Sequence, residues 1–375
     1  MRTVVDPRFA AELRRLRTQA GLSQDQLASQ VATVKGHISD MEHGRRNPSK
    51  QMAANIDLAL CGAGQLAALV SDGADLDGDE LDRLDHVAAN PRRADRAAVA
   101  SLRTMLKGQR QLDDYVGAAA VLPVAMSAQK IVQDLVTAAE GDIRNDVLDL
   151  GAQWSQFLGW LYTTSTNWPM AKLHFGRALE WATERGDADM IATVLSYQGH
   201  CHWLRGEFAP IVSLSQSARR DPSIYPGQLA YDAYQEARGL AGTGRVDEAV
   251  SALSEADDLA LANEAWTGPV PAWQYYRAPW FFALERGLVY RCMSRHDRRY
   301  APLAVDELSS GLTGMPAEWQ GAEWAGEYVA YLASAQRAAG DIPEAKATAE
   351  RARQIATATS SARVLAMATA VEQGL

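Results

Sequence analysis

The segment from Leu22 to Ser49 constrains the fold more than any other part of the chain, because it predicts two short helices joined by a tight turn. Ser23 followed by Gln26 has the pattern of a capping box, in which two side chains bind free backbone amides at a helix start. Leu27 and Val31 then lie one turn apart on the same face of this first helix. The first helix therefore has a defined start and one apolar face.

A second helix is predicted over residues 34–43, where Ile38 and Met41 recur at helical spacing. Ala28 on the first helix is small enough to let the two helices pack closely. Gly44 fits the end of the second helix, since glycine readily takes the left-handed conformation at that position. Basic residues follow this glycine at once.

The same segment resembles the Cro/C1-type (Xre) helix-turn-helix of bacterial and phage repressors. The spacing between the matching blocks contains no gap, and the blocks are Leu22–Ala28 (L-S-Q-x-x-L-A), Ile38–Ser39 (I-S), Glu42–Gly44 (E-x-G) and Arg46–Ser49 (R-x-P-S). The resemblance implies a DNA-binding domain of five short helices, the fifth holding Leu66, Leu69 and Val70. An ordinary two-helix hairpin would explain the caps, but not the basic cluster placed where a DNA backbone would run.

In this family the second helix enters the major groove with its N-terminal residues toward the bases. The resemblance assigns base reading to Lys35, Gly36, His37, Ser39 and Asp40, and backbone contacts to Gln24, Arg45, Arg46, Asn47 and Lys50. Two positions depart from the family pattern. Val34 replaces the usual capping Ser or Thr, so either Thr33 caps one residue early or the cap is lost, and Gly36 offers no side chain to a base. The smaller contact set implies modest specificity, which a homodimer on a two-fold operator would restore.

Charge is divided unevenly along the chain. Residues 1–70 hold nine Lys/Arg and six Asp/Glu, a net charge of +3, while the remainder carries −12 within a total of −9. The first segment can therefore attract phosphate while the rest repels it. A further basic run from Arg92 to Arg110 is expected to be a solvated helix face. Arginine outnumbers lysine 31 to 6, a bias associated with GC-rich, actinobacterial genomes.

Beyond residue 127 no strand-like alternation occurs, and short turns recur near residues 167, 206, 244, 295 and 340. Each turn precedes a helix that contains small residues. The pattern resembles divergent tetratricopeptide repeats, although the spacing exceeds the usual period of that family. The predicted fold is all-α: a repressor-type helix-turn-helix domain at 1–71, a linker at 72–80, a helical connector at 81–126 and an array of helical hairpins at 127–375.

An aromatic, proline-containing insertion from Asn263 to Trp280 interrupts the repeat pattern. All ten tryptophans lie beyond residue 150, and most are expected to fill gaps between stacked helices. Such a segment is poor repeat filler, however, and suits a loop beside a concave surface. We therefore predict a candidate ligand groove that is lined by the side chains of Trp266, Trp273, Tyr275, Tyr276 and Trp280.

Other chemistry is not indicated by the sequence. Adjacent residues on a helix point to different faces, so the run His200-Cys201-His202 does not predict a metal site. No phosphate-binding glycine loop or nucleophile signature is present, and we expect neither an enzyme nor a cofactor. Cys61, Cys201 and Cys292 are too scattered for a disulfide framework. No apolar run is long enough for a membrane span or a secretory signal, so a cytoplasmic protein without membrane contact is expected.

Two hypotheses follow. In the first, the chain is a sequence-specific transcriptional regulator that binds a double-stranded operator, and its repeats dimerise or sense a small molecule or peptide. This layout resembles the peptide-sensing quorum regulators of Gram-positive bacteria and the repeat-bearing regulators of actinobacteria. In the second, the chain is a protein-interaction scaffold whose helix-turn-helix does not bind DNA specifically. Val34, Gly36 and the acidic remainder motivate the second hypothesis.

Overall fold

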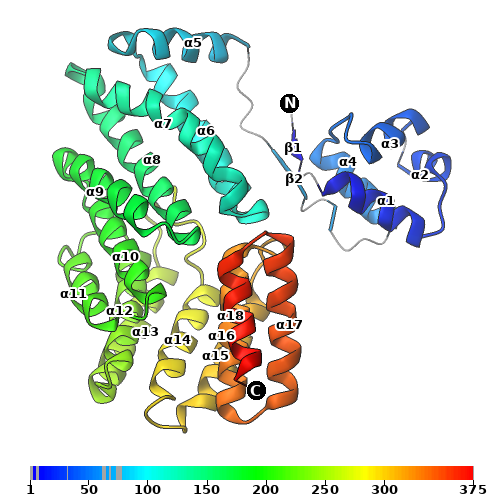
Figure 1. Ribbon diagram of the computed structural model, residues 1–375. Helices are drawn as coiled ribbons and strands as arrows, with labels where there is room; N and C mark the ends of the chain where they lie inside the picture. The colour runs from blue at the N-terminus through cyan, green and yellow to red at the C-terminus, as the bar shows by residue number, and fades with distance from the viewer. Residues whose placement is uncertain are drawn as a thin grey trace.

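The computed structural model describes residues 3–5, 8–31, 33–60, 65–66, 69–72 and 78–374. A small N-terminal group of helices lies beside a long curved array of helices (Figure 1). The N-terminal group consists of α1 (Phe9–Gln19), α2 (Gln24–Gln30), α3 (Lys35–Glu42) and α4 (Lys50–Leu60). Its core is apolar, with buried side chains on all four helices that include Phe9, Leu27, Ile38 and Ile56.

Two short strands close the N-terminal group. β1 (Thr3–Val5) and β2 (Val70–Asp72) pair antiparallel, with Val5 opposite Val70. The prediction of a fifth helix is therefore wrong at Val70, which lies in β2. Leu66 lies in a turn, where its backbone N–H donates to Oδ1 of Asp57 at 3.0 Å. Residues 67 and 68, also in the expected helix, lie outside the described residues.

The rest of the described chain is helical, as predicted. Three 3-10 turns lie between helices of the array, η2 (Pro91–Arg93), η3 (Gly141–Ile143) and η4 (Ala317–Trp319). The helices are α5 (Gly78–Ala89), α6 (Arg96–Val116), α7 (Ala118–Ala138), α8 (Arg144–Thr164), α9 (Trp168–Arg185), α10 (Ala188–Leu204), α11 (Phe208–Ala218), α12 (Pro226–Gly242), α13 (Val246–Glu264), α14 (Pro279–Met293), α15 (Tyr300–Gly314), α16 (Glu323–Ala339), α17 (Ile342–Ala358) and α18 (Ala362–Gln373).

The five predicted turns are confirmed, and they form the hairpins α8–α9, α10–α11, α12–α13, α14–α15 and α16–α17. Gly206, Gly244 and Gly340 have positive φ in three of these turns, the conformation that glycine takes without strain. Two predicted segment limits differ from the helices observed. The limit at 126/127 falls inside α7, which runs unbroken through Pro123, and the linker predicted at 72–80 overlaps β2 and the start of α5.

The array curls back on itself, so that α16, near the end of the array, contacts α6, near its start. Glu323, the first residue of α16, accepts hydrogen bonds from the N–H of Ala118 at 3.2 Å and from the hydroxyl of Ser361 at 2.7 Å. Arg8, one residue before α1, joins the N-terminal group to this corner. Its guanidinium donates to the carbonyl oxygens of Tyr115 and Ala358, both at 3.1 Å. Among the described residues, none of the helices is long and apolar enough to cross a membrane.

Close approach of α8 and α9 depends on glycine. A Cβ at Gly159 would lie 2.5 Å from ring atoms of the buried Phe175, whereas a Cβ at Gly176 on α9 would meet nothing within 4 Å. We expect Gly159→Ala to destabilise the protein by about 1–3 kcal/mol through overpacking. Gly176→Ala, the matched control, should stabilise it by roughly 0.5–1 kcal/mol through helix propensity. Thermal unfolding followed by circular dichroism measures both, and equal shifts of the two variants would contradict this packing.

Candidate functional site

The capping box predicted at the start of α2 is confirmed, whereas the start of α3 has no side-chain cap. Ser23 accepts from the N–H of Gln26 at 3.2 Å, and the Gln26 side chain accepts from the N–H of Ser23 at 2.8 Å. At the start of α3, Val34 takes the extended N-cap conformation with no side-chain cap. The Thr33 hydroxyl instead lies 3.0 Å from Nδ1 of His37. The capping hydrogen bond at α3 is therefore lost rather than moved one residue earlier.

The inner face of α3 is fixed by apolar packing and by one carboxylate. Ile38 and Met41 are buried, and the side chain of Glu42 is 2% exposed. Arg17 of α1 donates to Glu42 at 2.5 Å, and Gln24 of α2 donates to the same carboxylate at 2.7 Å. Burial disfavours the charged form, but these hydrogen bonds outweigh it and lower the pKa of Glu42. Gln24, predicted to contact phosphate, thus binds α3 in this structure.

The outer face of α3 carries the predicted base-reading residues. Lys35 and Gly36 are exposed, and His37, Ser39 and Asp40 are partly exposed on the same short helix. Nothing lies within 4 Å of a Cβ placed on Gly36, so this part of the helix presents bare backbone. The surface is open enough to approach a flat or grooved partner.

The predicted backbone contacts follow α3 directly. Arg45, Arg46 and Asn47 are exposed in the turn after the helix, and Gly44 has a φ of 67° there. Arg45 also pairs with Asp40 at 3.0 Å. This exposed pair contributes little stability, so both groups can exchange partners readily. The side chain of Lys50, at the start of α4, lies outside the described residues.

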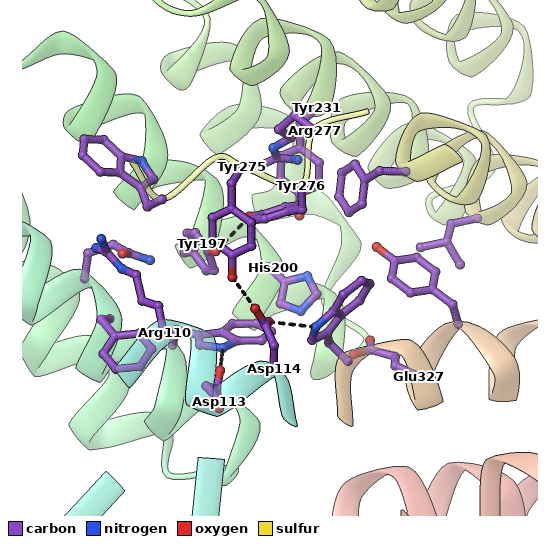
Figure 2. A pocket seen from close by; sticks show the side chains of 18 of the residues that line it. Arg110, Asp113, Asp114, Tyr197, His200, Tyr231, Tyr275, Tyr276, Arg277 and Glu327 are labelled. Carbon is purple, nitrogen blue, oxygen red and sulfur yellow. Dashed lines mark hydrogen bonds between the residues drawn. The ribbon is translucent and has the colours of Figure 1, made fainter. Parts of the chain in front are cut away.

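A second site lies inside the curve of the array (Figure 2). The centre of a water-sized molecule can occupy about 110 Å³ of the cavity. By the same measure, a single bound water needs roughly 10–15 Å³. It therefore holds several waters or one small molecule. Its walls are mainly aromatic and are built by Phe157, Trp160, Tyr197, Tyr231, Trp273, Tyr275, Tyr276, Phe281, Trp324 and Tyr328.

Three of the five aromatic residues predicted to form a ligand groove line this cavity, namely Trp273, Tyr275 and Tyr276. The other two do not. The indole N–H of Trp266 donates to the carbonyl of Pro269 within its own loop. Trp280 packs against Trp319 and Trp324 at ring distances of 5.6 and 6.0 Å. Both are held by neighbouring protein groups away from the cavity lining.

Two adjacent carboxylates at the end of α6 form the acidic side of the cavity. Asp114 accepts from the hydroxyl of Tyr275 at 2.6 Å and from the indole of Trp324 at 3.1 Å, and Asp113 accepts from the indole of Trp160 at 2.9 Å. Burial raises the pKa of Asp114 to about 6. Burial, together with the charge of Asp114, raises the pKa of Asp113 well above its ordinary value. Neither has a cationic partner within 4.0 Å among the described residues.

Two buried arginines also line the cavity, Arg277 on the side opposite the carboxylates and Arg110 on α6, one turn before them (Figure 2). Arg277 packs with its guanidinium carbon 3.8 Å from the ring centre of Tyr231, and its Nε donates to Gln274 at 2.9 Å. Its Nη1 is buried and has no hydrogen-bond partner among the described side chains and backbone. Arg110 donates to the side chain and carbonyl of Gln153 at 3.2 and 3.3 Å, and burial lowers its pKa to about 10.

His200 lies between these two sides. Both of its ring nitrogens are buried, and neither has a hydrogen-bond partner in the described part of the chain. Burial lowers its pKa to about 4, so the ring is neutral at pH 7. His202 points elsewhere, to Glu207 at 2.6 Å, and Cys201 contacts Thr163 at 3.2 Å. The three adjacent residues diverge, and no group of metal-binding side chains is found in the described ranges.

Sequence reasoning missed Arg110, Asp113 and Asp114 as site residues, and it expected Arg110 on a solvated face. The signal was present on α6. Leu102 and Leu106 define its buried face, and at helical spacing that face continues through Arg110 and Asp113. Polar residues that prolong an apolar stripe indicate a buried polar site rather than a solvated one.

Comparisons with known proteins support the N-terminal assignment. Residues 8–69 match the helix-turn-helix domain family. No curated protein matches the chain. The crystal structure of Bacillus thuringiensis PlcR in complex with the peptide PapR7 and DNA aligns over 98% of each chain, at 12% identity and a TM-score of 0.30. A similarity of that strength carries no conclusion on function. The chain thus contains a helix-turn-helix domain followed by an array of helical hairpins.

The Arg17–Glu42 pair gives the helix-turn-helix group a dependence on pH. Because the pKa of Glu42 is lowered in the folded state, the pair stabilises above the ordinary pKa of 4.5, and this contribution is lost as pH falls through the lowered value. Arg17→Met should destabilise α1 and α3 by on the order of 3 kcal/mol at pH 7 and by much less at low pH. Hydrogen exchange of their amides, corrected for intrinsic rates, measures this. Arg46→Met, at an exposed arginine in the turn after α3, is the control. A destabilisation by Arg17→Met that does not depend on pH would contradict the assignment.

Proposed function

We propose that this chain is a DNA-binding transcriptional regulator of the Xre type whose helical array binds an effector. The observation that carries the proposal is the helix-turn-helix domain at residues 8–69 with the outer face of its second motif helix open. Lys35 stands at the N-terminus of that helix, and Arg45 and Arg46 follow its end. In this proposal Lys35 reads bases, and Arg45 and Arg46 bind phosphates on either side of the groove.

Charge supports the same orientation. The +3 of residues 1–70 draws duplex DNA toward the helix-turn-helix, and the −12 of the remaining residues disfavours its contact with the array. Binding to two half-sites would compensate for the few side chains on α3, and we include a homodimer in the proposal. Light scattering of the purified protein with and without a palindromic duplex measures that stoichiometry.

The effector part of the proposal is supported by the cavity inside the array. Its size and its mixed aromatic and charged lining suit a small molecule. A ligand changes DNA binding only if it prefers one arrangement of the protein over another. The hydrogen bonds of Arg8 connect the DNA-binding group to the last turn of α6, which also carries Asp113 and Asp114.

The DNA face is tested by Lys35→Ala combined with Arg45→Ala and Arg46→Ala. The best duplex is first selected from a random pool with the unaltered protein. We expect the triple variant to bind it at least about tenfold more weakly, with the slope of log affinity against log salt reduced by about 0.9 for each lost phosphate contact. Mobility shift over a salt series measures both quantities. The control replaces the exposed Lys172, Lys346 and Arg351 of the array with alanine. Unchanged affinity would refute this face, and equal binding to every duplex would favour the interaction-scaffold alternative.

Gly36 provides an independent test. A methyl group there meets no protein atom, so Gly36→Ala should stabilise α3 by roughly 0.5–1 kcal/mol through helix propensity. If the backbone at this position approaches base edges, the same change should weaken binding to the selected duplex. Opposite effects on melting temperature and DNA affinity are expected. Higher stability with unchanged affinity would place the groove away from Gly36.

A further inference from the structure

The cavity of the array contains buried polar groups whose bonding capacity the protein leaves unused. Arg277 is 6% exposed and lines the cavity, yet its Nη1 has no hydrogen-bond partner among the described residues. Both ring nitrogens of His200 are in the same state. A buried donor without a hydrogen bond destabilises the folded protein, and a charged donor does so more strongly. The charged donor of Arg277 in particular indicates a ligand that completes it.

The charges of the cavity are separated rather than neutralised. Two lining charges are paired locally, since Arg238 binds Glu285 at 3.1 Å and Glu327 binds Arg363 at 2.6 Å. In contrast, Arg277 has no carboxylate within 4.0 Å among the described residues, and the same is true, for cations, of Asp113 and Asp114. Arg110 also lines the cavity and has no carboxylate within 4.0 Å among the described residues, but it lies on α6 one turn before Asp113 and Asp114. The side opposite these carboxylates thus holds the unpaired cation Arg277, whereas their own side holds two carboxylates and one arginine.

The acidic side also has the surroundings of an ammonium site. Trp160, Tyr275 and Trp324 hold the two carboxylates through their N–H and O–H groups and present aromatic surface to the cavity. Carboxylates combined with aromatic faces attract an organic cation, through charge and through the ring quadrupole. Figure 2 shows Asp113 and Asp114 on one side of the labelled residues, Arg277 on the other and His200 between them.

We infer that the cavity binds a small zwitterion of the amino acid class. Its ammonium group lies against Asp113 and Asp114, its carboxylate accepts from Nη1 of Arg277, and its short apolar body lies along the aromatic walls beside His200. The inference deepens the effector part of the proposed function and rests on it for the regulatory consequence. The cavity has room for two charged groups and a short apolar body between them.

The test uses the full chain without DNA. Isothermal titration calorimetry is run with the twenty standard amino acids and with 4-aminobutanoate, 5-aminopentanoate and 6-aminohexanoate. The tightest binder is then compared with two matched analogues, one lacking the carboxylate and one lacking the ammonium group. We expect the zwitterion to bind at least about tenfold more tightly than either analogue. Failure of every zwitterion to bind would overturn the inference, as would an amine or an acid that binds equally well.

Two sets of variants then test which side of the cavity binds the ammonium group of the ligand and which side binds its carboxylate. Asp113→Asn with Asp114→Asn keeps the shape of both side chains and should remove the preference for the zwitterion over the acid analogue. Arg277→Met keeps an apolar stem against Tyr231 and should remove the preference over the amine analogue. Asp257→Asn is the control, because Asp257 also accepts a hydrogen bond from a tyrosine hydroxyl, that of Tyr234, but does not line the cavity. Both preferences should survive there, and a variant that keeps a preference it should lose contradicts the assignment.

The analogue series on the unaltered protein does not depend on the folding of any variant. It is also independent of DNA, so the two proposals can fail separately. Loss of zwitterion binding would leave the mobility-shift result of the Lys35, Arg45 and Arg46 variant unchanged. Conversely, a protein that binds the zwitterion but no duplex would retain the ligand site and lose the regulator assignment.

Discussion

The curved array is closed by hydrogen bonds to buried carboxylates where α6 and α7 meet α16. Asp114 binds Tyr275 from the aromatic loop and Trp324 from α16, while Glu323 binds the first N–H of α7 and Ser361 before α18. Stacked helical hairpins normally contact only their neighbours in sequence. Three of these hydrogen bonds, made by Tyr275, Trp324 and the N–H of Ala118, instead join residues 161 to 210 positions apart. They close the curve of the array around a partly open cavity.

This closure is costly in electrostatic terms. Desolvation of each ionised carboxylate costs several kcal/mol, and the hydrogen bonds that Asp113 and Asp114 accept from two indoles and one hydroxyl offset only part of it. The raised pKa values of Asp113 and Asp114 express the remainder. A core of apolar residues would close the same corner without that cost. The retention of charge at this point is physically reasonable if a cation of complementary shape completes the network.

Local patterns predicted much of the fold because the interactions responsible are themselves local. The capping box at Ser23, the end of α3 at Gly44 and the five hairpin turns depend on residues within one or two helical turns of each other. The prediction of a fifth helix was wrong because of an interaction between residues far apart in the sequence. Val70 satisfies helical spacing with Leu66, but it pairs with Val5 in a sheet that no short window reveals.

The site was only partly predictable for the same reason. Composition singled out the loop at 263–280, and three of its aromatic residues reach the cavity. Arg110, Asp113 and Asp114 resembled a charged surface because their environment is created by helices far away in the sequence. Position on a buried stripe was the available signal, whereas the pairing of Asp114 with Trp324 required the curvature of the whole array.

Arg8 links the closed corner of the array to the helix-turn-helix group. Its two terminal nitrogens reach the last turn of α6 and the last residue of α17, which come from opposite ends of the folded array. The Arg8 side chain, next to the start of α1, thus spans the gap between these two ends of the array. If the gap widens, at least one of the two hydrogen bonds must lengthen, which weakens the link between α1 and the array. A change in the curvature of the array would thereby alter how firmly the helix-turn-helix group is held against it.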